Sequence, residues 1–160
     1  QTPITETLRT SHPTRLLHTM LRVSDLDRSI DFYTTLLGMQ LMRRERYPDG
    51  QFALAFLGYG AESTDSVLEL THNWDERTYA KGDAYGHIAL ECADIYMTCA
   101  TLQAAGVPVL RHPGPMSANS PDRANTEHIA FIQDPDGYRI ELIQQEATPV
   151  SRRPHAYRPN

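Results

Sequence analysis

An internal repeat constrains the fold of this 160-residue chain more than any other sequence feature. Residues 17–26 (LHTMLRVSDL) align with residues 86–95 (GHIALECADI), and each copy is followed by a helix-like stretch. Each copy then has an aromatic strand and a last strand that carries a glutamate, at residues 67–70 and 139–142. Self-similarity of this kind is stronger evidence about the fold than any local sequence pattern. Two copies indicate a duplicated half-domain rather than a solenoid.

The length and the 40% apolar content predict one globular domain made of two pseudo-symmetric halves that share a sheet and a core. We place this domain at residues 16–146, with module one at about 16–80 and module two at about 84–146. Residues 1–15 and 147–160 lack hydrophobic periodicity and are expected to be loosely ordered arms.

Composition excludes several classes of protein. The net charge of −5 and the scattered basic residues predict no nucleic-acid partner. The longest apolar runs are far below the ~20 residues that span a bilayer, and the first residues lack the pattern of a signal peptide, so we expect a cytoplasmic protein without a membrane partner. Cys92 and Cys99 are expected to be small buried residues, because two cysteines do not make a disulfide framework.

Hydrophobic periodicity predicts the elements of module one. Residues 16–23 alternate as a strand, which puts His18 and Arg22 on one face, about 13 Å apart at ~3.3 Å per residue. A helix follows, capped by Ser24 or Asp25, with an apolar stripe and a C-terminal Gly38. The stripe consists of Leu26, Ile30, Tyr33 and Leu37. Strands are expected at 40–46, 52–59 and 67–73, and the last of these places Glu69 and Asn73 on one face.

Module two repeats this order with a helix at about 94–105, a short strand near Val109 and a tight turn at residues 134–137 that leads into the Glu141 strand. Residues 111–126, rich in Pro, Gly, Ser and Asn, form the longest irregular stretch. This stretch is the candidate for a mobile loop over a site.

The repeated histidine and glutamate are the candidate metal ligands. Taken singly, a histidine on a strand is more often a core residue, and an inward glutamate can pair with an arginine. The repetition of both at matching offsets favours ligands, and the set consists of His18, Glu69, His87 and Glu141. Two imidazoles and two carboxylates suit a divalent ion such as nickel, cobalt, zinc or manganese. Open coordination positions would make that ion a Lewis acid, beside which a carboxylate can act as base.

The chain resembles the glyoxalase I (lactoylglutathione lyase) family of the vicinal oxygen chelate superfamily. The resemblance rests on residues 16–26, 28–33, 37–39, 85–90 and 134–143. It implies an α+β fold of two pseudo-symmetric βαβββ modules forming a curved mixed sheet, and a homodimer with metal sites between the subunits. It also implies isomerisation of the hemithioacetal of methylglyoxal and glutathione to S-lactoylglutathione through a metal-bound enediolate.

Residue by residue, the resemblance places one divalent metal on His18, Glu69, His87 and Glu141. Glu141 becomes the principal proton-transfer carboxylate and Glu69 the second catalytic carboxylate. Arg22, Asn73 and His87 become substrate-binding residues, with glutathione as co-substrate.

The short chain resembles the nickel- and cobalt-activated bacterial branch of the family, so nickel is favoured, with cobalt and zinc as alternatives. Two positions depart from the zinc-using branch. Asp83 stands where those enzymes carry an arginine, and the loop at 117–127 replaces a lysine-bearing loop, which leaves Arg111 and Arg123 as candidate loop cations.

Rival functions within the superfamily are a dioxygenase, an epimerase or a thiol transferase. Glu69 argues against the first two, since a dioxygenase needs two histidines and one carboxylate with iron and the epimerases usually have glutamine there. A rival from another class is a metal-free binding protein of the same fold. The presence of all four ligand residues argues against it.

Overall fold

The computed structural model describes residues 11–75 and 78–147, which fall into two compact units. The first unit comprises Gln1–Tyr85 with Asp134–Tyr138, and the second comprises Gly86–Gln133 with Arg139–Asn160. The predicted arms lie largely outside the described residues, and the predicted module boundaries remain predictions.

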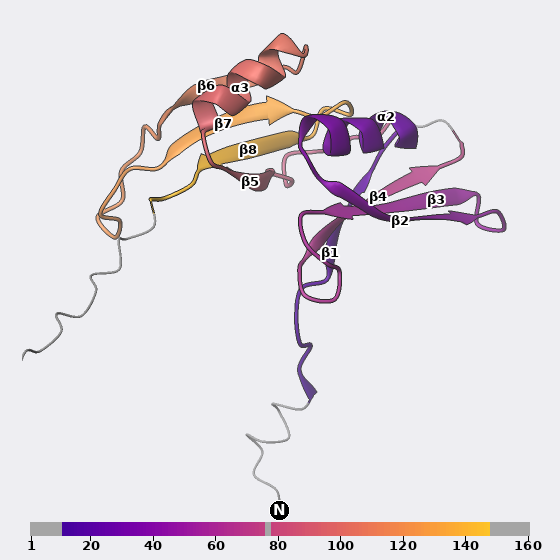
Figure 1. Ribbon diagram of the computed structural model, residues 1–160. Coiled ribbons are helices and arrows are strands. Elements are labelled where there is room, and N and C mark those ends of the chain that lie inside the picture. The colour runs from indigo at the N-terminus through magenta and orange to yellow at the C-terminus, as the bar shows by residue number, and fades with distance from the viewer. Residues whose placement is uncertain (1–10, 76–77, 148–160) are drawn as a thin grey trace, which may run out of the picture. The chain divides into compact units, whose positions relative to one another are not determined.

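The first unit contains a four-stranded mixed sheet in the order β1-β4-β3-β2 (Figure 1). Strand β1 pairs in parallel with β4, and the other neighbours are antiparallel. The bounds are β1 His18–Arg22, β2 Gln40–Tyr47, β3 Phe52–Gly58 and β4 Val67–Asn73. These strands confirm the predicted alternation, with bounds shifted by at most two residues.

The predicted first helix exists, but its second half is not α-helical. Helix α2 spans Leu26–Asp31 and continues as the π-helical segment Phe32–Leu36. The Asp25 side chain caps the start by accepting a hydrogen bond from the Arg28 main-chain N–H, and Gly38 follows the end with φ +73°.

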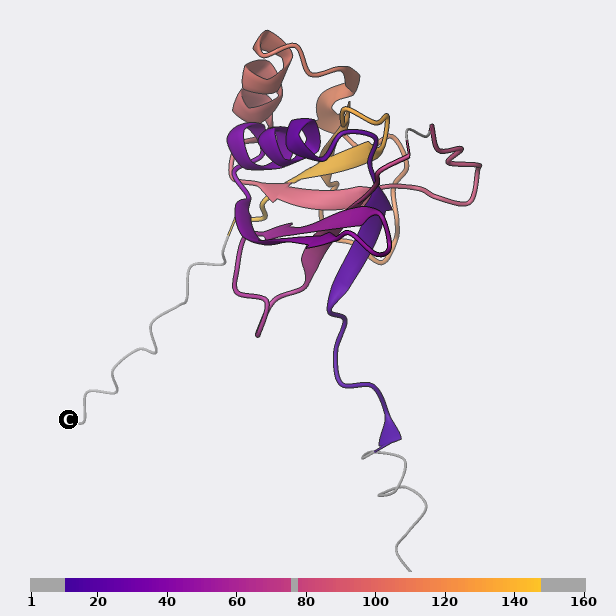
Figure 2. The ribbon, with the colours of Figure 1, turned by 90° about the vertical axis from the view of Figure 1, so that its right-hand side faces the viewer.

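The π-helical segment changes which side chains are buried, because its i→i+5 hydrogen bonds widen the turn and rotate the residues beyond Asp31 relative to a regular α-helix. Phe32 and Tyr33 are both buried, whereas Ile30 and Leu37 of the predicted stripe are only half-buried. In Figures 1 and 2, α2 lies along one face of its own sheet.

The second unit repeats this architecture, with strand order β5-β8-β7-β6 and helix α3 at Ile95–Ala104. The bounds are β5 Ile88–Cys92, β6 Val109–Pro115, β7 His128–Gln133 and β8 Arg139–Gln144. The predicted second helix is confirmed, and the Asp94 side chain caps it by accepting hydrogen bonds from the main-chain N–H groups of Tyr96 and Met97. The fold class, α+β with a βαβββ order in each module, is thereby confirmed, but the described strands form two four-stranded sheets rather than the single shared sheet that was predicted.

The irregular stretch predicted at 111–126 begins too early, because β6 extends to Pro115. The Arg111 guanidinium explains the extension, since it donates to the carbonyls of Ile129 at 2.7 Å and Pro115 at 2.8 Å and holds β6 to β7 despite two prolines. The loop starts at Met116, whose N–H donates to the Glu127 carbonyl at 2.8 Å.

Each unit has its own apolar core between helix and sheet. In the first unit Val23, Tyr33, Ala55, Leu57 and Leu70 are fully buried, and in the second Ile95, Ala130, Ile132 and Ile140 are. Cys92 and Cys99 are buried free thiols, as expected, and burial raises the pKa of both. No helix in the described part of the chain is long and apolar enough to cross a membrane.

The turn Asp134–Tyr138 belongs by its contacts to the first unit, although it connects β7 and β8. The Tyr33 hydroxyl donates to Asp134 at 2.8 Å, and the Tyr138 hydroxyl donates to the Arg22 carbonyl at 2.7 Å. The Asp136 carboxylate accepts from the Ser24 N–H and hydroxyl at 3.0 and 2.6 Å. This motif of the sequence therefore anchors a loop to β1 and α2 as well as turning the chain.

Candidate metal and substrate site

The first histidine–glutamate pair joins the two parallel strands of the first unit. His18 Nε2 lies 2.7 Å from Glu69 Oε2, and the histidine side chain is 37% exposed against 13% for the glutamate. The register explains the contact, because His18 stands opposite Val67, two residues before Glu69 on the same face of the sheet. The carboxylate is thus sheltered while the imidazole reaches solvent.

The second pair reproduces the first in the second unit. His87 Nε2 lies 2.9 Å from Glu141 Oε2, with side chains 39% and 14% exposed. His87 immediately precedes β5, whose Ile88 pairs with Ile140, so the histidine again stands two residues before the glutamate of the parallel neighbour. The structure therefore brings the four predicted ligand residues together as two separate pairs of equal geometry.

A phenylalanine edge packs against each histidine. Phe56 pairs across the strands with Glu69, and its ring contacts the His18 ring at 5.4 Å in a T-shaped arrangement. Phe131 pairs with Glu141 and contacts His87 at 5.3 Å in the same way. These rings fix the orientation of the imidazoles and form an apolar wall beside each pair.

A guanidinium group also lies over each of these phenylalanine rings, and the sequence analysis did not predict these two arginine contacts. The guanidinium carbon of Arg43 lies 3.6 Å from the centre of the Phe56 ring, and that of Arg139 lies 4.8 Å from Phe131. Arg43 pairs directly with Phe56 across the strands, so the alternation of β2 combined with its antiparallel pairing could have placed it on the site face.

Arg43 belongs to a charged network on that face. It donates to Glu62 at 3.1 Å and to Glu45, which also accepts from the Tyr47 hydroxyl. These contacts lower the pKa of Glu45, chiefly through the Tyr47 hydroxyl and then through Arg43, and the bond to Glu45 raises the pKa of Tyr47. The face beside the first pair is therefore lined by an aromatic ring and paired charges.

The two pairs supply donors of the kind that divalent metals bind. Each pair offers one imidazole nitrogen and one carboxylate oxygen, the donors that nickel, cobalt and zinc accept. Among residues 11–75 and 78–147, no group of three or more His, Cys, Asp and Glu side chains converges within one site. Each pair supplies two ligands, so a four-ligand centre would need two such pairs.

The predicted substrate-binding residues lie at the far end of the same strands. Arg22 is exposed at the end of β1, and Asn73 ends β4, where its side-chain amide donates to the Tyr79 hydroxyl at 2.9 Å. Arg22 pairs with Thr71, two residues before Asn73 on the same face.

The two candidate loop cations are engaged within the second unit. Arg111 donates to main-chain carbonyls of β6 and β7, as described above. Arg123 forms ion pairs with Glu127 at 3.2 Å and Glu146 at 2.7 Å. Neither guanidinium is free of protein partners.

The remaining histidines lack the repeated pattern of the ligand pairs, which predicts packing or solvent-facing roles, and the described ones have such roles. His72 contacts the Val23 carbonyl through Nδ1 at 3.2 Å, and His128 contacts the Tyr96 hydroxyl at 2.9 Å. His12 and His112 are exposed. His155 lies outside the described residues.

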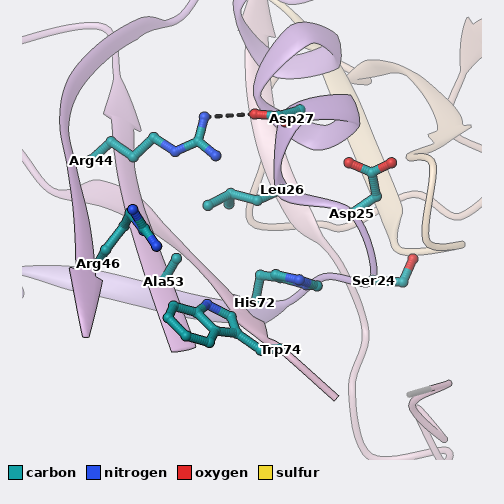
Figure 3. A pocket seen from close by; sticks show the side chains of 9 residues that line it. All are labelled: Ser24, Asp25, Leu26, Asp27, Arg44, Arg46, Ala53, His72 and Trp74. Carbon is teal, nitrogen blue, oxygen red and sulfur yellow. Dashed lines mark hydrogen bonds and ion pairs between the residues drawn. The ribbon is translucent and has the colours of Figure 1, made fainter. Parts of the chain in front are cut away.

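A pocket of about 460 Å³ in the first unit lies away from the His18–Glu69 pair, on the helix-bearing face of the sheet (Figure 3). Its charged side chains pair within the protein, with Arg44 2.6 Å from Asp27 and the Arg46 guanidinium 5.6 Å from the centre of the Trp74 ring. It contains none of the predicted site residues.

Comparisons with known proteins agree with this geometry. A family model described as the Glyoxalase/Bleomycin resistance protein/Dioxygenase superfamily matches residues 15–142. A probable lactoylglutathione lyase of Vibrio cholerae is 55% identical over 132 residues, which cover 82% of this chain and 91% of that protein. The lactoylglutathione lyase of Neisseria meningitidis serogroup B is 53% identical over 133 residues, with 83% and 92% covered.

Among solved structures, glyoxalase I from Zea mays superposes with a TM-score of 0.74 at 41% identity, covering 84% of this chain and 46% of the maize chain. The chain thus spans about half the length of the maize enzyme. The matched residues include both histidine strands and reach Leu142, one residue beyond Glu141. The chain therefore belongs to the glyoxalase/bleomycin resistance protein/dioxygenase superfamily.

Proposed function

We propose that the chain catalyses the lactoylglutathione lyase reaction, the isomerisation of the methylglyoxal–glutathione hemithioacetal to S-lactoylglutathione. The observation that carries the proposal is the duplicated histidine–glutamate pair, at 2.7 and 2.9 Å, in a chain 53% and 55% identical to bacterial proteins of that name. The reaction moves one proton between adjacent carbons, so it needs a carboxylate base and stabilisation of a developing oxyanion.

The two glutamates have the accessibility that proton transfer needs. Both carboxylates are mostly sheltered, at 13% and 14% exposed, and each lies on the strand next to a phenylalanine. Glu141 takes the C1 proton and returns it at C2, and Glu69 is the second, less important carboxylate. Both are also metal ligands, together with His18 and His87.

The glyoxalase I family uses a divalent metal and a glutathione substrate. When bound, the metal supplies Lewis-acid stabilisation of negative charge on the substrate oxygens. We propose nickel as the native ion, with cobalt as a functional substitute. Support for nickel comes from the two-nitrogen, two-oxygen donor set and from the resemblance to the short bacterial branch.

The test is formation of the thioester from methylglyoxal and glutathione, followed by its absorbance, after chelation and re-addition of single metals. Chelation should abolish activity, and nickel or cobalt should restore most of it and zinc little. Higher turnover with zinc than with nickel would contradict the choice of metal. No thioester with any of these ions would contradict the reaction itself.

We further propose a homodimer in which His18 and Glu69 of one protomer share a metal with His87 and Glu141 of its partner. Each unit carries one complete pair among its described residues, so two pairs must meet to hold a four-coordinate ion. A two-fold dimer would then contain two equivalent sites.

Mixed dimers of Glu69→Ala and Glu141→Ala chains test the shared site. Either homodimer should be inactive, because every site lacks a ligand. A mixed dimer has one site with both lesions and one site with none, so refolding equal amounts together should restore about a quarter of wild-type activity for random, independent pairing. If each protomer held its own site, no activity would return, provided that the wild type refolds under the same conditions.

Arg22 and Asn73 are proposed to bind glutathione, and His87 to contact the substrate as well as the metal. Their support is the shared face of β1 and β4, at the end of the strands beyond His18 and Glu69. The domain is proposed to occupy residues 16–146 in modules 16–80 and 84–146. A cytoplasmic location is proposed because the free buried thiols suit a reducing compartment that contains glutathione.

A further inference from the structure

Three cationic side chains converge on a pocket of about 220 Å³ in the first unit. The residues that matter to its chemistry are Arg22, Arg28, Lys81, Tyr79, Asp136 and Tyr138. The pocket adjoins the end of β1, and Tyr79 ties it to Asn73 at the end of β4 through the 2.9 Å amide–hydroxyl bond. It is therefore next to the residues proposed above to bind glutathione.

Arg28 is the one of these three cations that pairs with a carboxylate of the pocket, Asp136. Its Nη2 donates to the Ser24 hydroxyl at 2.9 Å and lies 3.7 Å from Asp136 Oδ1. Asp136 is held in turn by Ser24 and by the Ser29 hydroxyl at 3.3 Å. This pair is structural and contributes little net charge to the pocket.

Arg22 and Lys81 are the cations that remain. In the part of the chain that the structure describes, neither is within ion-pair distance of a carboxylate. The Lys81 ammonium lies 5.0 Å from the centre of the Tyr138 ring, a cation–π contact that positions it without consuming its hydrogen-bond donors. The pocket thus presents two unneutralised positive charges.

The Tyr79 hydroxyl adds a third donor. It accepts from the Asn73 amide, so its own hydrogen is free to be donated. A guanidinium, an ammonium and a hydroxyl hydrogen together match the oxygens of a carboxylate. Asp136 Oδ2 receives the 3.3 Å bond from Ser29, whereas Ser24 and Arg28 contact Oδ1, so Oδ2 keeps acceptor capacity for an ammonium beside that carboxylate.

We propose that Lys81, acting with Arg22 and Tyr79, binds the α-carboxylate at the γ-glutamyl end of glutathione, and that Lys81 is a specificity residue for the thiol half of the substrate. The inference rests on the proposed function and deepens it. The γ-glutamyl end is chosen over the glycine end because it alone carries an ammonium next to its carboxylate, which Asp136 can accept.

Lys81 is the only lysine in the sequence, so its ammonium can be followed alone. Reductive ¹³C-methylation of the nickel-loaded protein labels Lys81 and the terminal amine, which its lower pKa distinguishes. Adding S-methylglutathione should shift the dimethyl-lysine resonance in a saturable way. A resonance that does not move while calorimetry shows that the ligand binds would overturn the proposal.

Binding measurements on variants locate the contact. Lys81→Met should bind S-methylglutathione about tenfold more weakly, as expected for one charge-assisted hydrogen bond at a partly exposed site. Lys81→Arg should recover most of the loss. In turnover, KM should rise with little change in kcat, because the contact is made equally in ground and transition states.

Two truncated ligands supply the matched controls. The S-methyl derivative of glutaryl-Cys-Gly keeps the γ-glutamyl carboxylate and lacks the ammonium, so Lys81→Met should still cost about tenfold. The 4-aminobutyryl derivative lacks that carboxylate, so the variant and the wild type should bind it equally. An equal loss with the 4-aminobutyryl ligand would place Lys81 at the glycine carboxylate and overturn the proposal.

The failure of the two proposals can be told apart. If the nickel-loaded wild type neither binds S-methylglutathione nor forms the thioester, the proposed function fails and the role of Lys81 fails with it. If the wild type does both and Lys81→Met, folded by circular dichroism, matches it with every ligand, only the role of Lys81 is overturned.

Discussion

Replacing Tyr33 by phenylalanine removes one hydroxyl from the most buried polar contact of the first unit. Tyr33 is 0% exposed and Asp134 is 4% exposed, and the hydroxyl donates to Asp134 Oδ2 at 2.8 Å. The other carboxylate oxygen accepts from the main-chain N–H groups of Asp136 and Tyr138 at 2.9 and 2.8 Å. The substitution leaves the aromatic ring and its contact with Phe32 in place.

The expected loss follows from the charge on the acceptor. Hydrogen bonds to charged groups contribute about 1.5–3 kcal/mol, so Tyr33→Phe should lower the free energy of unfolding by about 2 kcal/mol at neutral pH. For a chain of this length that corresponds to a thermal midpoint roughly 4–8 °C lower.

The loss should depend on pH, with a definite sign. Burial raises the pKa of Asp134 above its ordinary value, although the bonds from Tyr33 and the main chain oppose that rise. The folded protein therefore keeps the Asp134 proton to a higher pH than the unfolded chain, and this site's contribution to stability falls as the pH rises through the folded pKa. Without the Tyr33 bond the folded pKa of Asp134 rises further, so the stability difference between variant and wild type should be smallest where Asp134 is protonated, at low pH, and largest at neutral pH.

Urea unfolding at several pH values, followed by circular dichroism, measures this difference, and the dependence on urea should be unchanged. Tyr138→Phe is the matched control, because its hydroxyl donates to the neutral carbonyl of Arg22 at 2.7 Å. That variant should lose about 1 kcal/mol without this pH dependence. The reasoning is refuted if Tyr33→Phe costs less than about 0.5 kcal/mol at neutral pH, a third of the low end of the charged-bond range, or if its cost does not change with pH.

Three further predictions concern the site and the thiols. Glu141→Gln should retain metal, measured by elemental analysis, and lose orders of magnitude in turnover because no base remains. Glu69→Gln should lose less turnover. Equal losses would mean that both carboxylates take part in proton transfer. Arg22→Ala should raise KM more than it lowers kcat in steady-state assays. An unchanged KM would show that Arg22 is a surface residue that does not bind the substrate. Cys92 and Cys99 should react with an aromatic disulfide reagent far more slowly than free glutathione until the protein unfolds, because burial raises both pKa values; rapid reaction in the native state would show that the α3 face opens readily.

Much of the site could be predicted from the sequence because strand alternation is a local rule. A period of two fixes that His18 and Arg22 share a face of their strand and that Glu69 and Asn73 share a face of theirs, and the repeat makes these faces correspond in both modules. The cap at Asp94 and the glycine at position 38 were equally predictable, because each depends on the conformation of one or two residues.

The features that were missed depend on residues distant in the chain. The π-helical segment at Phe32–Leu36 buries Tyr33, and Tyr33 bonds to Asp134 across 101 positions. Strand β6 passes through two prolines because Arg111 holds it to carbonyls up to 18 residues away. No local window contains both partners of such contacts, so propensity alone predicted a regular helix and an irregular loop.

The sequence by itself determined the chemical identity of the candidate site, because a duplicated histidine and glutamate at matching strand positions restrict the donor set before any distance is known. Tertiary structure decided how those donors are presented. Pairing of β1 with β4 and of β5 with β8 sets the 2.7 and 2.9 Å contacts, and pairing of β2 with β3 puts Arg43 on Phe56. The Asp134–Tyr138 turn and Lys81 meet at Arg22 only after the chain has folded. The physical reason is that side-chain periodicity depends only on consecutive residues. Strand registers, ring contacts and pockets depend instead on pairings between segments many residues apart.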